Sequence, residues 1–189
     1  MTVHEVLSIG HPALRQRATE TPLEQIASSE IQNLIDDLID TMRHAHGAGI
    51  AANQIGATQR ICVLEVNNNP RYPYKPKIPL TVAINPVVKT VGTGTFLNNE
   101  GCLSVPLRGD VKRFTSAHIS YLDRHGDNQV FDAHGLTAAT WQHEVDHLNG
   151  VLFIDKSDPA TLTTWEEFET HHRTAFLERI TNLQNEWTK

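Results

Sequence analysis

Two histidines four positions apart, His143 and His147, are the residues of this chain best placed for metal chemistry. On a helix, side chains four positions apart lie on one face about one turn from each other, so both imidazoles can bind one ion. Glu144 follows the first histidine, where its carboxylate can reach a water held by the ion. The pattern predicts metal-assisted hydrolysis of an amide, although a solvated helix face with two histidines and two acids gives the same letters.

A catalytic metal site needs a third protein ligand and an open position for water. The spacing of a metzincin would place a third histidine at position 153, and Phe153 excludes that reading. A thermolysin-like site would take a downstream carboxylate, for which Glu166 or Glu167 lies at a suitable distance along the chain. A thiolate from Cys102, upstream, is the other candidate. The residue spacing alone leaves these last two sources open.

The elements that must position these residues follow from apolar spacing. Recurrence every three to four positions predicts helices at residues 26–45, 137–149 and 165–187, the last marked by Trp165 to Trp187. Apolar or alternating runs predict strands at 60–66, 80–88, 116–122 and 129–131, with a hairpin turn at 123–128. The first helix should end at Gly47 and Gly49, and Thr137 or a near neighbour should cap the second. We expect one α+β domain spanning residues 1–189, with antiparallel sheets packed around a central helix that carries the motif and with a C-terminal helix.

One stretch between predicted strands is rich in proline. Pro70, Pro73, Pro76 and Pro79 recur at every third position, which favours polyproline II locally. A recognition motif for a partner is one interpretation. Since loops carry most prolines of a folded chain, the sequence predicts a surface loop.

Composition narrows the classes of protein. The 189 residues carry a net charge of −6 and are 39% hydrophobic, which fits a folded globular chain. The basic stripe of a DNA-binding protein is missing, as are a secretory leader and an apolar run of the ~18 residues that a membrane span needs. Of the two cysteines, Cys62 lies in an apolar run that predicts a buried thiol. We expect a cytoplasmic protein that binds neither DNA nor membrane.

Three blocks of the sequence, taken together, resemble the motifs of the peptide deformylase family. The blocks are Gly47-Ala48-Gly49-Ile50-Ala51-Ala52-Asn53-Gln54, Glu100-Gly101-Cys102-Leu103-Ser104 and Gln142-His143-Glu144-Val145-Asp146-His147. They follow one another in the family's order and at suitable separations. The resemblance implies removal of the N-formyl group from the initiator methionine of new polypeptides, with release of formate.

The resemblance also implies roles for individual residues. Cys102, His143 and His147 would hold the metal, typically Fe²⁺ in the cell, with Zn²⁺, Ni²⁺ or Co²⁺ also able to occupy such a site. Metal-activated water would attack the formyl carbonyl, with Glu144 as general base and then general acid. The Gln54 amide and the Leu103 backbone N–H would stabilise the oxyanion.

The substrate-binding residues implied by the family include three small residues that would pair with the peptide as with an added strand. The full set is Gly47, Ala48, Gly49, Gly101, Arg108, Leu136 and Ala139. Ala48 and Ala139 are smaller than is common in the family, which predicts a wider pocket that is more tolerant of first side chains other than methionine. Arg108 would hold the peptide or a nearby acid, or else be a solvated surface residue.

Four further expectations concern contacts and partners. Arg113 could pair with Asp146 and so support the metal helix from behind. The C-terminal helix should serve for packing, with contact to the ribosome as the alternative. The expected partner is a formylated nascent peptide, and the protein is expected to be a monomer.

Overall fold

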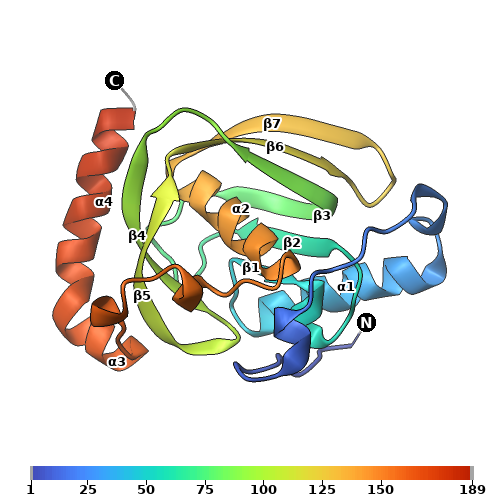
Figure 1. Cartoon of the computed structure of the whole chain (residues 1–189), viewed down its shortest axis with the longest axis horizontal. Helices are drawn as coiled ribbons and strands as arrows, with labels where there is room; N and C mark the ends of the chain where they lie inside the picture. The colour runs from blue at the N-terminus through green and yellow to red at the C-terminus, as the bar shows by residue number, and fades with distance from the viewer. Residues whose placement is uncertain (1, 188–189) are drawn as a thin grey trace.

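The computed structural model contains two antiparallel sheets (Figure 1). It describes the backbone of residues 2–187 and the side chains of residues 2–184. The larger sheet has the strand order β1-β2-β3-β6-β7. Its strands are β1 (Gly49–Ala51), β2 (Ile61–Val66), β3 (Ile78–Thr90), β6 (Ser116–Leu122) and β7 (Asn128–His134). The smaller sheet is a hairpin of β4 (Thr95–Cys102) and β5 (Val105–Phe114). These strand pairs are all antiparallel, as predicted, and β1 lies at the edge of the larger sheet.

Helix α2 (Gly135–Leu148) carries the two-histidine motif and lies between the two sheets (Figure 1). It contacts strands of both sheets, so most of its side chains are buried, Trp141 and Leu148 among them. The helix begins at Gly135, which has a φ of 54°, and no side chain caps its first turn. The predicted cap at Thr137 or a near neighbour is therefore wrong, because the chain enters the helix directly from β7.

Helix α1 (Ser29–His44) packs against β1 and β2 through its apolar stripe, which includes Ile35 and Leu38. The Ser28 hydroxyl accepts the Ile31 N–H at 3.3 Å and caps the helix, so it begins later than the predicted residue 26. The helix also ends without a glycine in the left-handed region: His46 adopts a φ of 52° instead. Gly47 and Gly49 therefore do not end the helix, and their role must lie elsewhere.

The C-terminal segment continues through three helical stretches beside β4 (Figure 1). They are α3 (Trp165–Glu167), a π-helical turn (Phe168–His172) and α4 (Arg173–Trp187). Phe168, Phe176 and Ile180 are buried in one cluster with Phe96 of β4, which confirms the predicted packing role. The side chain of Trp187, part of the predicted stripe, lies outside the described residues.

Short 3-10 turns connect these elements. They are Pro12–Arg15, Leu23–Gln25, Ala52–Ile55, Phe153–Asp155 and Pro159–Thr161. The turn at Ala52–Ile55 follows β1 directly and carries Gln54 into the space between β1 and β4.

The strands that the sequence did not predict are β1, β4 and β5. The hairpin of β4 and β5 buries polar side chains, namely Asn98, Asn99, Glu100 and Arg108. A half-buried strand is recognised by alternation of apolar and polar residues, so a strand whose buried face is polar escapes that signal. Three of these polar residues, Asn98, Asn99 and Glu100, line the pocket described below.

Candidate metal centre and pocket

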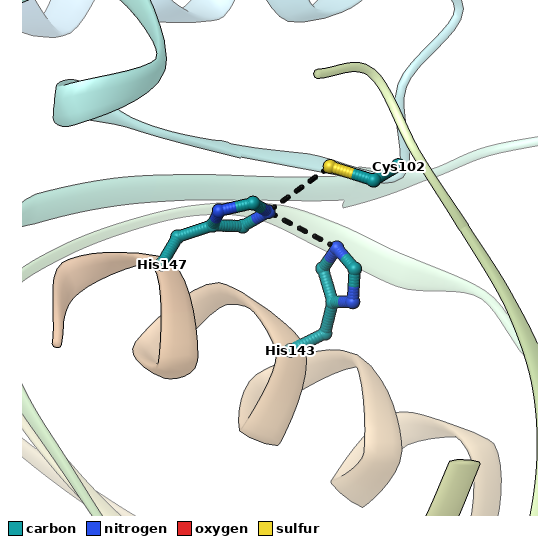
Figure 2. Close-up of side chains that lie close together, drawn as sticks. All are labelled: Cys102, His143 and His147. Carbon is teal, nitrogen blue, oxygen red and sulfur yellow. Dashed lines mark hydrogen bonds between the residues drawn. The ribbon is translucent and has the colours of Figure 1, made fainter. Parts of the chain in front are cut away.

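Three potential metal ligands come together where α2 faces the end of β4 (Figure 2). The ligand atoms of Cys102, His143 and His147 all lie within 4.8 Å of one another. His147 Nε2 is 3.2 Å from Cys102 Sγ and 3.2 Å from His143 Nε2. Nitrogen ligands about 2.0–2.1 Å from a tetrahedral ion are themselves about 3.3 Å apart, so this donor set fits a single divalent ion.

The thermolysin-like alternative does not fit this geometry. Glu166 and Glu167 lie on α3, where both are exposed to solvent. Among the described residues, the group of three that could hold an ion contains the thiol of Cys102 and no downstream carboxylate. The upstream cysteine is therefore the third candidate ligand.

A buried ion-pair network holds His143 from behind. Its Nδ1 donates to Glu100 Oε2 at 2.9 Å, which leaves Nε2 as the ring nitrogen that faces the ligand cluster. Arg113 donates to both oxygens of Glu100, at 2.7 and 2.8 Å, and also to Asp146 Oδ2 at 2.6 Å. The predicted pair of Arg113 with Asp146 is confirmed. Burial raises the pKa of Glu100, but Arg113 and His143 outweigh it and hold that pKa well below its usual range.

Phe153 also supports His143. Its buried ring stacks on the imidazole, with ring centroids 6.4 Å apart and planes 26° from parallel. Phe153, whose presence excludes a third histidine ligand at position 153, therefore helps to fix the orientation of His143.

Cys102 lies among groups that favour its thiolate. Ser104 N–H donates to Sγ at 3.3 Å, and Gln54 Nε2 donates to it at 3.6 Å. Burial raises the pKa of Cys102, but His147 and His143 outweigh this effect and lower the pKa well below its usual range. A thiolate is the form in which cysteine binds a metal.

Glu144 stands beside the ligands with one carboxylate oxygen uncommitted. Its Oε2 is buried and has no hydrogen-bond partner among the described residues. Burial raises the pKa of Glu144, with His143 and His147 opposing the rise. A Cβ at position 49 would lie 2.6 Å from Glu144 Cδ, so Gly49 is required for β1 to pass this close to the carboxylate.

A pocket beside the cluster collects most of the residues that the sequence singled out. Lining it from that set are Gly47, Ala48, Gly49, Gln54, Gly101, Cys102, Leu103, Ala139, His143 and Glu144. The Gln54 side chain is fixed there, because its Oε1 accepts the Ala51 N–H at 2.9 Å and its Nε2 donates to Ser104 Oγ at 3.0 Å.

Two predicted substrate-binding residues do not line this pocket. Leu136 is buried one turn before Ala139, in the apolar cluster against the C-terminal helix. Arg108 is 1% exposed, so the solvated alternative is wrong, and it donates to Asn99 and Tyr74 rather than to an acid. Its guanidinium lies over the Trp165 ring, 4.2 Å from the centroid, behind Gly101.

The proline-rich segment of residues 67–77, between β2 and β3, reaches into the same pocket. Tyr72, Tyr74 and Lys75 all line it, and Tyr72 is buried. Ala48 and Ala139 line the pocket together with these three residues. The prediction of a loop between strands is confirmed, whereas its placement wholly on the surface is wrong. Motif reasoning missed this segment because a loop residue gives no periodic signal.

Thr140, Asn98 and Glu100 also line the pocket without having been singled out for it. Thr140 could have been found, because it lies one turn before His143 on the same helix face.

None of the described helices combines the length and the apolar character needed to span a bilayer.

Comparison with known proteins agrees with this geometry. The sequence model of the Polypeptide deformylase family matches residues 3–162. Peptide deformylase 2 of Nostoc sp. is 41% identical over 163 residues, which cover 86% of this chain and 90% of that protein. The chloroplastic peptide deformylase 1A of Solanum lycopersicum is 39% identical, over 87% of this chain and 63% of its own length.

Solved structures show the same fold. The class I type b peptide deformylase of Acinetobacter baumannii with Met-Ala-Ser bound has a TM-score of 0.78 and 35% identity, over 82% of this chain and 98% of that one. The peptide deformylase of Thermotoga maritima has a TM-score of 0.73 and 32% identity, over 84% and 100%.

Proposed function

The chain belongs to the polypeptide deformylase family, enzymes that hydrolyse the formyl group from N-terminal formylmethionine, and we propose that Cys102, His143 and His147 hold its metal. The observation that carries the proposal is the convergence of these ligand atoms within 4.8 Å, next to an unpartnered oxygen of Glu144. When bound there, a divalent metal would lower the pKa of a water and polarise the formyl carbonyl.

Glu144 is the proton carrier in this proposal. Its Oε2 is free to accept a proton from the attacking water and to return it to the leaving amine. Burial raises the pKa of the carboxyl group, which brings its proton affinity closer to that required of a base working near neutral pH.

Gln54 and Leu103 face the carbonyl oxygen of the substrate in this proposal. The Gln54 amide is held by Ala51 and Ser104, so it needs no reorganisation when negative charge develops. Leu103 lines the same pocket and would contribute its backbone N–H.

The substrate backbone would extend the larger sheet at β1. This strand is at the sheet edge, and the small residues Gly47, Ala48 and Gly49 line the pocket on that side. Gly101 and Ala139 would contact the first side chain, whereas Arg108 and Leu136 would act by supporting the pocket walls.

Several narrower statements rest on the sequence and the family. We propose Fe²⁺ as the metal in the cell, with Zn²⁺, Ni²⁺ or Co²⁺ as substitutes, and a monomer of one catalytic domain over residues 1–189. We further propose that the enzyme works in the cytoplasm on nascent peptides at or near the ribosome, without binding DNA. Metal analysis after anaerobic purification tests the identity of the metal. Light scattering tests whether the protein is a monomer.

Formate release from formyl-Met-Ala-Ser tests the function. Glu144→Gln should retain the metal and lose about 10²–10⁴-fold in turnover. Cys102→Ala should lose the metal, whereas the matched variant Cys62→Ala, at a buried thiol of the core, should keep it. Normal turnover by Glu144→Gln, or full metal binding by Cys102→Ala, would overturn the proposal.

A further inference from the structure

The pocket beside the metal ligands has little of the apolar lining expected for a methionine side chain. Of the described side chains that line it, Leu103 is the one aliphatic group larger than alanine. Polar lining comes from Lys75, Asn98, Asn99 and Thr140, in addition to two tyrosines. Asn98 donates to Glu100 and Asn99 donates to Asp110, whereas Lys75 and Thr140 bond to each other inside the pocket. Ligand pockets place their few polar groups where they fix orientation and specificity, so a substrate group could engage this last pair.

Lys75 is the only lysine or arginine among the described residues that line the pocket. Its Nζ donates to Thr140 Oγ1 at 3.0 Å and lies 4.9 Å from the centroid of the Tyr72 ring. An ammonium group has three N–H donors, so one remains for a ligand after these two contacts. Thr140 is itself fixed, since its hydroxyl donates to the Leu136 carbonyl at 2.9 Å.

The 67–77 segment that carries Lys75 is tied down at several points. Asn69 Nδ2 donates to the Gly47 carbonyl at 2.8 Å, and Arg71 lies over the Trp165 ring, 4.4 Å from its centroid. Trp165 follows the part of the chain that the family model matches, at residues 3–162. The segment that carries Lys75 is therefore fixed by contacts to Gly47 and to Trp165.

Lys75 and Thr140 are hydrogen-bonded to each other, and both side chains line the pocket. A first side chain that packs against Lys75 would compete with Thr140 for the ammonium group. A hydrocarbon end that displaces the ammonium leaves it without this hydrogen bond, which is costly for a half-buried charge. A side chain ending in an oxygen acceptor replaces the lost bond.

We propose that Lys75 is a specificity-determining residue through which the pocket accepts, beside methionine, a first side chain that ends in a neutral oxygen acceptor. The inference rests on the proposed function, because it concerns the side chain that follows the formyl group. A neutral acceptor is favoured over a carboxylate, since Glu100 and Glu144 line the same pocket.

Three formylated peptides of nearly equal size test the inference: formyl-Gln-Ala-Ser, formyl-Met-Ala-Ser and formyl-norleucyl-Ala-Ser. Only the glutamine peptide has a first side chain that ends in an oxygen acceptor. For the unaltered enzyme, kcat/KM for the glutamine peptide should equal or exceed that for the norleucine peptide. Lys75→Met should lower the glutamine-to-norleucine ratio about 10- to 100-fold, the range expected for loss of a charged hydrogen bond.

Lys77→Met is the matched control, because it removes the same charge from an exposed position of the same segment. It should leave the ratio within threefold. Thr140→Val keeps the ammonium and removes its resting partner, so it should raise kcat/KM for the norleucine peptide. A ratio unchanged by Lys75→Met, in an enzyme that still releases formate, overturns this inference alone. Absence of formate release from all three peptides by the metal-loaded, unaltered enzyme would instead overturn the proposed function.

Discussion

Replacing Arg113 by methionine should destabilise the protein strongly, because it removes the charge that balances a buried carboxylate. The side chains of Arg113 and Glu100 are 2% and 3% exposed. Breaking such a pair from one side costs about 3–5 kcal/mol. Asp146 keeps its bonds to Lys156, at 2.7 and 2.8 Å, so the loss falls mainly on Glu100.

The chain contains a matched pair at the surface. Arg43 donates to both oxygens of Glu65, at 2.7 and 3.0 Å, but its side chain is 51% exposed. Arg43→Met should therefore cost at most about 1 kcal/mol. The residue types and the two-bond geometry are the same in both pairs, so the two variants differ in the burial of the pair and in the further bonds from Arg113 to Asp146 and from His143 to Glu100.

Urea denaturation of chelator-treated protein, followed by circular dichroism, measures these free energies of unfolding. Adding Glu100→Gln to Arg113→Met should recover part of the loss, because the double variant no longer buries an unpaired charge. A chelator-competition titration should also show about 10- to 100-fold weaker metal binding by Arg113→Met, since Glu100 orients His143. A cost below 1 kcal/mol for Arg113→Met, or no recovery in the double variant, would refute the reasoning.

Three further outcomes follow from the site. Gly49→Ala should retain the metal and lose about 10²-fold in kcat, measured by formate release, because the added Cβ displaces Glu144; an unchanged kcat would contradict this close approach. Phe153→Ala should cost about 3–5 kcal/mol in urea denaturation and weaken metal binding, since its buried ring stacks on His143; retained metal affinity would mean that the ring does not orient the ligand. The folded-state pKa of Glu100 is lowered from 4.5, so its stabilisation is complete above pH 4.5 and is lost as the pH falls from there; the slope of stability against pH should be shallower in Arg113→Met, and equal slopes would argue against the pairing.

The part of the site that the sequence could predict is the part fixed by helical periodicity. His143 and His147 had to share a face of α2, and Glu144 had to lie beside them. Cys102 could be assigned only through the family resemblance, because its position depends on the hairpin of β4 and β5, whose buried polar face hides the strand pattern. Phe153 could be excluded as a ligand, yet nothing in its position along the chain indicates that its ring supports His143.

The pocket was predicted less well for a physical reason. Ala48 and Ala139 line the pocket, as predicted, but Lys75 and the two tyrosines line it as well, and they come from a loop that carries no motif. The ligands stand on α2 and β4, whereas Lys75 arrives on a loop between β2 and β3. Chemistry and selectivity are therefore carried by separate parts of the chain, so substitutions in residues 67–77 should change which formylated peptide is preferred while leaving metal content unchanged. Family membership, which is carried by the metal-binding motifs, cannot by itself specify that preference.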